Sequence, residues 1–257
     1  MLVAHSLAGK VGLAVGVANT HSIATGCTRA FRAAGAELAM TYLNDRALPF
    51  VESVAPEVEA TVLAPLDVER DGQLDAVIDR ISAAWGRLDF LLHAIAFCPS
   101  EDLHGRVVDC SRAGFAQAMD ISVHSLIRMT RLAEPLMRGG GSILTVSYYG
   151  AEKVVEHYNV MGPVKAALEA TVRSLAAELG PEGIRVNALS PGPIATRAAS
   201  GLDRFEDLLA AAKARSPGRR LVTIEEVGAV AAVLAGDAAR GVTGNVTFID
   251  GGLNVVA

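Results

Sequence analysis

The feature that most constrains this sequence is a regular alternation of short apolar segments with longer amphipathic ones. Continuous apolar runs, such as Lys10–Val15 and Phe90–Ala94, are typical of strands that are buried on both faces. The segments between the runs have the apolar spacing of helices. Strands that alternate with helices indicate a parallel sheet covered by helices on both sides. We therefore predict a doubly wound α/β fold with about seven strands.

The predicted elements follow one another from residue 10 to residue 250. Strands are predicted at Lys10–Val15, Glu37–Tyr42, Thr61–Leu66, Phe90–Ala94, Ser142–Ser147, Ile184–Ser190 and Thr247–Asp250. Helices are predicted at Ser22–Ala34, Asp71–Trp85, Arg112–Met137 and Tyr158–Leu179. No fixed-period repeat, low-complexity tract or linker divides the chain. We therefore expect residues 1–257 to form a single domain.

The least regular part of the sequence lies at residues 191–223, before the last predicted strand. It contains a Pro-Gly-Pro motif, small residues and one helical segment at Phe205–Arg215. Connections of this length are often lids or binding loops. We predict that residues 191–223 form a substrate-binding loop or lid; the alternative is a surface segment that only covers the sheet.

Charge and composition exclude several functions. The net charge of −5 provides no basic field for sequence-independent binding of nucleic acid. No apolar run approaches the roughly 20 residues of a membrane-spanning helix. The cysteines and the six histidines lack metal-ligand spacing, so we expect no metal site. Because the first ten residues do not resemble a secretion leader, we expect a reduced, cytoplasmic setting and no membrane insertion.

A possible dinucleotide site follows the first predicted strand. Gly16 permits a tight turn, and Gly26 is expected to let the next helix approach the sheet closely. Backbone N–H groups at Ser22 and Ile23 would face a pyrophosphate at the helix start. The middle glycine of the usual Gly-x-Gly-x-x-Gly motif is missing, so this motif alone is weak. Its place on the first strand of an alternating chain favours a Rossmann-type fold.

Two further positions bear on the choice of cofactor. Asp67 and Val68 follow the third predicted strand, where Asp67 could accept a hydrogen bond from adenine or could simply cap a helix. No basic residue directly follows the second strand to hold a 2′-phosphate. Arg46 is close enough to leave NADPH open. We therefore expect NADH, with NADPH as the alternative.

A tyrosine and a lysine near a dinucleotide site suggest reductase chemistry. Tyr158 and Lys165 are seven positions apart, which on one helix places them on the same face about 10 Å apart. The lysine would hold the ribose, and its charge would favour the tyrosine as a donor. Elsewhere, such a pair is usually a packed aromatic ring and a solvated amine. Tyr148 lies just after the fifth predicted strand.

Further motifs run in order along the sequence. They are Gly16-x5-Ser-Ile-Ala-x-Gly, Asp67-Val68, His93-x-Ile95-x-Phe97, Ser147-Tyr-x-Gly-Ala-Glu152, Tyr158-Asn-x-Met-Gly162, Lys165, Gly180-Pro-Glu-Gly-Ile-Arg-Val-Asn187, Gly192-Pro-Ile-x-Thr196, Ala198-Ala-Ser-Gly201 and Asp250-Gly-Gly252. In these motifs the chain resembles the short-chain dehydrogenase/reductases, and specifically their divergent branch of bacterial enoyl-acyl-carrier-protein reductases. The Tyr-x6-Lys spacing and the Ser-Ile-Ala-x-Gly motif are typical of that branch.

The resemblance implies a role for each matching residue. Catalysis is implied for Tyr148, Tyr158 and Lys165, with the direct role of Tyr148 in proton transfer left open. Cofactor binding is implied for Gly16, Ser22, Ile23, Leu43, Asp67, Val68, Ile95, Lys165, Ile194, Ala195, Thr196, Arg197 and Ala198. Substrate contact is implied for Cys98, Tyr148, Tyr158, Met161 and Phe205. As lone apolar residues, Cys98, Met161 and Phe205 are equally compatible with the core.

The resemblance also implies a reaction. Hydride from NADH would reduce the double bond of a trans-2-enoyl thioester, on acyl carrier protein or coenzyme A, in the last step of type II fatty acid elongation.

One alternative is a carbonyl reductase of the wider superfamily, since Thr145 lies 13 residues before Tyr158, where that branch has a serine. Another is a non-catalytic NAD-sensing regulator. A homotetramer is expected, although Val164–Leu179 and Leu253–Ala257 could equally be internal core.

The sequence departs from the family pattern in two places, one residue and one short stretch. Ala96 occupies a position that is usually glycine, and its methyl group is expected to weaken inhibitors that stack on the nicotinamide. The stretch Asp203-Arg204-Phe205-Glu206-Asp207 is acidic, whereas the family has basic residues there. Because acyl carrier protein is itself acidic, we expect a shifted docking site near Lys213–Arg220 or a different carrier.

Overall fold

The computed structural model describes residues 6–196 and 204–256. Within these residues the chain forms one sheet of seven parallel strands in the order β3-β2-β1-β4-β5-β6-β7. The strands are β1 (Val11–Val15), β2 (Glu37–Tyr42), β3 (Val62–Pro65), β4 (Phe90–His93), β5 (Gly141–Val146), β6 (Ile184–Pro191) and β7 (Val246–Ile249). The strand order reverses between β1 and β4, where folds of this type bind their ligands.

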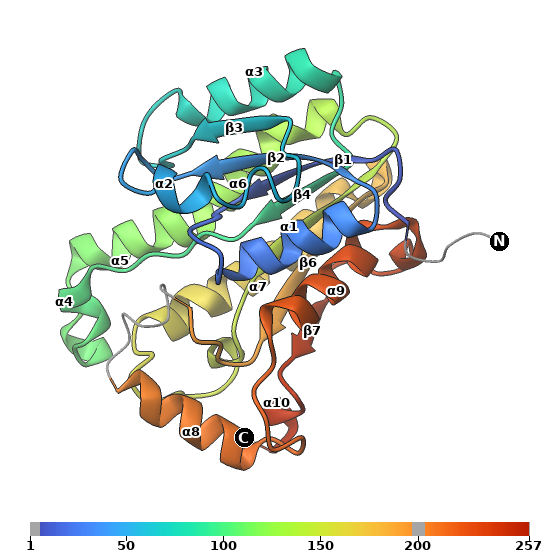
Figure 1. Ribbon diagram of the computed structural model, residues 1–257. Helices are drawn as coiled ribbons and strands as arrows, with labels where there is room; N and C mark the ends of the chain where they lie inside the picture. The colour runs from blue at the N-terminus through green and yellow to red at the C-terminus, as the bar shows by residue number, and fades with distance from the viewer. Residues whose placement is uncertain (1–5, 197–203, 257) are drawn as a thin grey trace.

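Helices cover both faces of the sheet (Figure 1). One face carries α1 (Ile23–Ala33), α2 (Leu48–Val51) and α9 (Ile224–Ala235); the other carries α3 (Gln73–Trp85), α5 (Arg112–Met119), α6 (Ser125–Ala133) and α7 (Met161–Leu179). Successive residues of a strand pack into the cores on opposite faces of the sheet: Leu91 packs on the α7 side and Leu92 on the α1 side. The predicted doubly wound α/β fold is confirmed.

Three short or peripheral helices lie outside these two layers. They are α4 (Ser100–Leu103), α8 (Phe205–Arg215) and α10 (Leu253–Val256). Figure 1 shows α8 and α10 together at the lower end of the molecule. The helix predicted at Phe205–Arg215 is therefore present with those bounds.

The predicted helix Arg112–Met137 is interrupted. A π-helical turn at Asp120–His124 separates α5 from α6, and a 3-10 turn at Glu134–Leu136 follows. Inside the π turn, the Ser122 hydroxyl is hydrogen-bonded to both the N–H and the C=O of Phe97. The α6 helix ends at Ala133, and the chain continues as the 3-10 turn that contains Pro135, which has no N–H group to extend the α-helical hydrogen bonds. These interruptions depend on tertiary contacts and on one proline, so apolar periodicity did not reveal them.

The prediction that Tyr158 lies on a helix is wrong. The α7 helix begins at Met161, and the φ angles of His157 and Asn159 are +63° and +44°. Left-handed residues on both sides of Tyr158 exclude a regular helix there. The Asn159 side chain donates a hydrogen bond to the Leu103 carbonyl of α4 at 2.6 Å, which stabilises this turn. Tyr158 therefore sits on a separate turn ahead of Lys165.

The helix α9 was not predicted from the sequence. It begins with a capping box, in which the Thr223 hydroxyl accepts a hydrogen bond from the Glu226 N–H and the Glu226 carboxylate accepts one from the Thr223 N–H. This Thr-x-x-Glu pattern was the available signal. The segment before β7 thus contains two helices, α8 and α9, rather than the one predicted.

Gly26 has a different structural role from the predicted one. A Cβ atom at Gly26 would lie 2.2 Å from the carbonyl oxygen of Ile224, and one at Gly228 would lie 2.2 Å from the carbonyl oxygen of Gly26. The glycines therefore let α1 pack closely against α9. The close approach is between two helices, not between a helix and the sheet.

The apolar face of α7 belongs to the core. Val164, Leu168 and Val172 are fully buried against the sheet. At the other end of the chain, Leu253 is buried, whereas Val255 and Val256 are exposed. In the described ranges, no helix is both long and apolar enough to cross a bilayer, and no group of three His, Cys, Asp or Glu residues is placed to hold a metal.

Candidate active site

The predicted site residues gather at one edge of the sheet. Gly16 follows β1, Leu43 follows β2, Asp67 follows β3, and Ile95 follows β4. Tyr148 follows β5, and the segment from Gly192 follows β6. Because all the strands are parallel, their carboxyl ends meet at the same edge. The predicted residues are thus placed around the point where the strand order reverses.

The loop after β1 is built for an anion. Gly16 has a φ angle of +97°, and a Cβ atom there would lie 2.2 Å from the Ala94 carbonyl oxygen, so only glycine fits. Ser22 is the N-cap of α1, and its hydroxyl accepts a hydrogen bond from the Thr25 N–H at 3.2 Å. The first-turn N–H groups of Ile23 and Ala24 have no acceptor within the helix. These donors at a positive helix end fit a diphosphate group.

Leu43, Asp67 and Val68 lie on the β2–β3 side of the edge. The Leu43 side chain is 55% exposed, which fits a residue that packs on a flat ring. The Asp67 carboxylate accepts a hydrogen bond from the Glu69 N–H at 3.0 Å and pairs with Arg70. It thus caps the turn before α3, the structural alternative weighed for it, and a contact with adenine stays a prediction. Val68 is buried.

Lys165 is buried at the carboxyl end of β5. Its Nζ atom donates a hydrogen bond to the carbonyl oxygen of Val146 at 2.6 Å. An ammonium group has three donors, so two remain for ribose hydroxyl groups. Burial lowers the pKa of Lys165 to about 8, and the negative charge of Glu169 opposes this shift. The lysine is therefore charged at neutral pH and near its titration point in mild alkali.

Tyr148 and Tyr158 form an edge-to-face pair beside Lys165. Their ring centroids are 4.8 Å apart. Gly150 permits this contact, because a Cβ atom there would lie 2.6 Å from the Tyr158 ring. Burial is the main cause that raises the pKa of both phenols, so each is a neutral hydrogen-bond donor. The Tyr148 hydroxyl is buried without a well-formed hydrogen bond to the described residues, which leaves it available to a ligand.

The loop after β4 is held by the π turn between α5 and α6. Ser122 bonds both backbone polar groups of Phe97. Ile95 is half-buried, and Ala96 is exposed at the site edge. Cys98 is half-buried, and burial raises the pKa of its thiol to about 11, so it is a neutral apolar neighbour.

The remaining predicted residues divide into three groups. Met161 is buried in the core beneath α7, as the structural alternative for it allowed. Phe205 is buried at the start of α8. Ile194 packs against the core on the α1 side, Ala195 is exposed, and Thr196 is half-buried. Arg197 and Ala198 lie outside the described residues.

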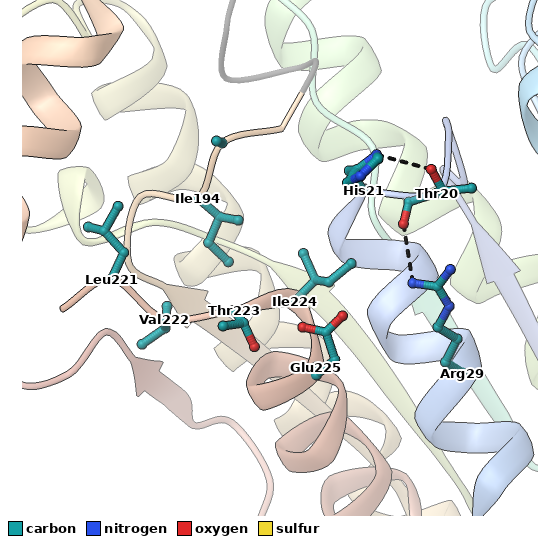
Figure 2. A pocket seen from close by; sticks show the side chains of 10 residues that line it. Thr20, His21, Arg29, Ile194, Leu221, Val222, Thr223, Ile224 and Glu225 are labelled. Carbon is teal, nitrogen blue, oxygen red and sulfur yellow. Dashed lines mark hydrogen bonds between the residues drawn. The ribbon is translucent and has the colours of Figure 1, made fainter.

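A cavity of about 480 Å³ lies between the start of α1 and the start of α9 (Figure 2). Of the predicted residues, Ile194 and Ala195 line it. Most of its lining was missed from the sequence; these residues are Thr20, His21, Arg29, Leu221, Val222, Thr223, Ile224 and Glu225. Ile224 and Glu225 belong to the unpredicted α9 and Thr223 is its N-cap, which explains why these three were missed.

A buried polar network that was not predicted lies behind the site. The His93 Nδ1 atom is 3.0 Å from the Thr145 hydroxyl, and its Nε2 atom is 2.8 Å from the Ser125 hydroxyl. Burial lowers the pKa of His93 to about 3, so the ring is neutral. Thr145 is fully buried. Its hydroxyl is engaged with His93, which argues against the catalytic role that the carbonyl reductase alternative requires.

A parallel sheet of this strand order, with a helix start facing the reversal point and a tyrosine–lysine pair beside it, defines a dinucleotide-dependent reductase of the short-chain type. The sequence model described as "Enoyl-(Acyl carrier protein) reductase" matches residues 16–254. The chain belongs to this enoyl reductase family.

Relatives and solved structures agree with this assignment. The chain is 49% identical to "Enoyl-[acyl-carrier-protein] reductase [NADH] 1" of Rhizobium meliloti, over 96% of this chain and 91% of the relative. An Anaplasma phagocytophilum enoyl-(acyl-carrier-protein) reductase in complex with NAD is 46% identical, with a TM-score of 0.94, 98% of this chain covered and 96% of the other. A Bacillus cereus enoyl-acyl carrier protein reductase with NADP⁺ and indole naphthyridinone is 44% identical, with a TM-score of 0.95 and 98% of both chains covered.

Proposed function

We propose that this protein reduces the double bond of a trans-2-enoyl thioester with NADH, the last step of type II fatty acid elongation. The observation that carries the proposal is the family match over residues 16–254 together with Tyr158 and Lys165 at the expected edge of the sheet. The engaged Thr145 hydroxyl speaks against a carbonyl reductase. The backbone donors at the start of α1, which have no acceptor within the helix, and the Tyr158–Lys165 pair speak against a regulator without catalysis.

The cofactor residues are assigned by their places along the edge. Gly16, Ser22 and Ile23 would hold the diphosphate, and Leu43, Asp67 and Val68 the adenosine. The nicotinamide side would be held by Ile95, Lys165, Ile194, Ala195, Thr196, Arg197 and Ala198. Bound NADH supplies the hydride for the β-carbon of the substrate.

The protein residues stabilise the charge that follows hydride addition. Negative charge would develop on the thioester oxygen, and Tyr158 would donate a hydrogen bond to it. Uptake of a proton at the α-carbon would then complete the saturated acyl chain. The Lys165 ammonium group binds the ribose hydroxyl groups and keeps positive charge beside the tyrosine. Tyr148 packs against Tyr158, and its buried hydroxyl is proposed as a second donor to the substrate.

Substrate binding is assigned to Cys98, Tyr148, Tyr158, Met161 and Phe205, within a single domain whose residues 191–223 would form the substrate-binding loop or lid. Support comes from α8 in that segment, because its residue Ala212 packs in one cluster with Tyr149 and Tyr148. The apolar contacts extend from α8 toward the tyrosine pair. An acyl chain would find an apolar surface there.

The function is tested by following the loss of NADH absorbance with crotonyl and dodecenoyl thioesters, each on coenzyme A and on acyl carrier protein. Turnover of either thioester supports enoyl reduction. Binding of NADH without any thioester turnover, but with reduction of a ketone, would favour the carbonyl reductase. Comparison of NADH with NADPH tests the cofactor assignment. The Rhizobium meliloti relative is named as an NADH enzyme, and Arg46, the residue that would favour NADPH, is exposed.

The acidic surface on α8 bears on the carrier. Asp203 lies outside the described residues, while Glu206 and Asp207 are exposed. Arg204 pairs with Asp207 at 2.8 Å, which neutralises part of the charge. Lys213 and Arg215 lie in the last turn of the same helix. We propose that an acyl carrier protein, if it is the carrier, docks toward this basic end.

Charge reversal at positions 203, 206 and 207 to lysine is expected to lower the KM for an acyl-carrier substrate several-fold. The reason is that removing like charge favours the encounter with an acidic carrier. The KM for a neutral short-chain thioester should not change, and this serves as the control. An unchanged KM for the acyl-carrier substrate would show that these acids do not oppose docking.

Replacing Ala96 with glycine is expected to tighten inhibitors that stack on the nicotinamide, such as triclosan or a diazaborine. Ala96 is exposed next to the half-buried Ile95, and its methyl group would narrow the space in which such an inhibitor stacks. Removing the steric clash between this methyl group and the inhibitor is expected to raise the inhibitor's affinity about 10-fold. Inhibition constants measured at saturating cofactor test this, with the KM for NADH as the control. Equal inhibition constants in both proteins would refute the role of Ala96.

We also propose a homotetramer in a reduced, cytoplasmic setting. Phe115 on α5 and Ile127 on α6 are about 40% exposed. Val255 and Val256 at the end of α10 are more exposed, at 74% and 50%. Such exposed apolar side chains are typical of interfaces when they lie together. Cys27, Cys98 and Cys110 are free thiols. Sedimentation of the purified protein measures the oligomeric state directly.

A further inference from the structure

One buried charged group near the site has no part in the mechanism above. Glu169 is 4% exposed and lies on α7, one helical turn beyond Lys165. Its Oε1 atom accepts a hydrogen bond from the Ser147 hydroxyl at 2.6 Å. This distance is typical of a hydroxyl that donates to a carboxylate. A buried carboxylate is costly unless it is hydrogen-bonded or paired, so its presence here needs an explanation.

The end of β5 is attached to α7 at two successive turns. The Val146 carbonyl oxygen accepts from Lys165, and the adjacent Ser147 hydroxyl donates to Glu169. The Ser147 N–H donates in turn to the Leu189 carbonyl of β6 at 2.7 Å. The next residue along the chain is Tyr148. These bonds thus join the strand end that leads into Tyr148 to the helix that carries Lys165.

We propose that Glu169 is a positioning residue for Lys165: held by Ser147, it fixes the lysine's ammonium group at the carboxyl end of β5 and keeps it charged. The proposal rests on the ribose-binding role assigned to Lys165. Ser147 belongs to the same unit, because it orients the carboxylate. Together, Ser147, Glu169 and Lys165 would bind the ribose diol of the cofactor, which the charged lysine contacts.

The charges around Lys165 agree with this role. Burial lowers the lysine pKa, and Glu169 is the group that raises it again. His93 on β4 also faces the lysine but is neutral. Tyr158, ahead of α7, is neutral as well and has its pKa raised by burial and by Glu169.

Glu169 has charged neighbours of its own. Burial and Glu152 raise the pKa of its carboxyl group, while the Ser147 bond, Arg173 and Lys165 lower it. The negative charge of Glu169 is therefore the main local support for a charged Lys165. Its removal should shift the titration of the lysine to lower pH.

The change Glu169→Gln tests the charge while keeping the shape and an acceptor for Ser147. The dissociation constant for NADH, measured by fluorescence from neutral to alkaline pH, should rise in the wild type as Lys165 loses its proton near pH 8. In Glu169→Gln the midpoint should fall by about one pH unit. Glu178→Gln, the same change at an exposed site on α7, should leave the midpoint in place. An unchanged midpoint in Glu169→Gln would overturn the proposal.

The change Ser147→Ala tests the hydrogen bond and does not alter the charge. The midpoint should stay near that of the wild type, whereas the NADH dissociation constant at neutral pH should rise several-fold because Glu169 and Lys165 lose their fixed positions. If Glu169→Gln does not fold, an unchanged NADH dissociation constant in Ser147→Ala would by itself refute the positioning role.

Lys165→Ala separates this proposal from the function on which it rests. If the pH midpoint of NADH binding persists in Lys165→Ala, the role assigned to the lysine is wrong. If the midpoint disappears there but does not move in Glu169→Gln, the lysine assignment survives and only the role of Glu169 fails. Thioester turnover by the wild-type protein tests the proposed reaction independently of both.

Discussion

Replacing Tyr158 with phenylalanine is expected to lower the kcat for an enoyl thioester by about 10²- to 10⁴-fold. In the proposed mechanism the phenol donates the hydrogen bond that stabilises charge on the thioester oxygen, and phenylalanine removes only that donor. The ring contact with Tyr148 at 4.8 Å is retained, so the fold of the turn should persist. Steady-state turnover and NADH affinity, measured on the same preparation, separate loss of catalysis from loss of cofactor binding.

The matched control is Tyr42→Phe, which removes a phenol hydroxyl from the end of β2, far from the tyrosine pair in the strand order. Its kcat should stay within about two-fold of the wild type. If Tyr158→Phe also retained nearly full turnover, the donor would have to be another group. Tyr148, whose buried hydroxyl is available to a ligand, would then be the residue to change next.

Replacing Gly26 with alanine is expected to destabilise the protein by about 2–4 kcal/mol. The new Cβ atom would lie 2.2 Å from the Ile224 carbonyl oxygen, a backbone atom that cannot rotate away. Alanine gains about 1 kcal/mol of helix propensity over glycine, which is too little to offset the separation of α1 from α9. Guanidinium unfolding followed by circular dichroism measures the difference.

Gly241→Ala provides the comparison for this change. A Cβ atom at Gly241 has no neighbour within 4 Å, so the variant should be about as stable as the wild type. Gly228→Ala should behave like Gly26→Ala, since it places a Cβ atom 2.2 Å from the Gly26 carbonyl oxygen. Because both changes separate the same two helices, the double variant should lose less than the sum. Equal stability of Gly26→Ala and Gly241→Ala would show that the helices can shift freely.

The strands could be predicted closely because their pattern is local. The first strand was predicted at Lys10–Val15 and is found at Val11–Val15, and the second has the predicted bounds. Each is a short apolar run, and its burial on both faces follows from composition alone. Helix α9 was not predicted, because its capping signal is short and it follows an irregular segment. The π turn before α6 was not predicted, because it depends on the contact between Ser122 and Phe97, which lie far apart in the sequence.

Part of the site followed from motifs, while its local geometry did not. Placing Gly16 and Asp67 just after their strands was sufficient to bring them to one edge of a parallel sheet, whereas Lys165 reaches that edge from α7 through its bond to the Val146 carbonyl. The conformation at Tyr158 was predicted wrongly, because the bond from Asn159 to Leu103 joins positions 56 residues apart. The Ser147–Glu169 bond spans 22 residues in the same way. Sequence spacing carries no information about such pairs.

The strand order also has a consequence for how this chain is synthesised and folds. β1, which precedes the other six described strands in chain order, lies near the middle of the sheet, and its neighbour β4 begins only at Phe90. The glycine-lined face of α1 is covered by α9, which begins at Ile224. A nascent chain therefore exposes this apolar face to water until most of its length has been made. Contacts between such distant segments slow folding, so this side of the core should be the last to form and the most exposed to aggregation.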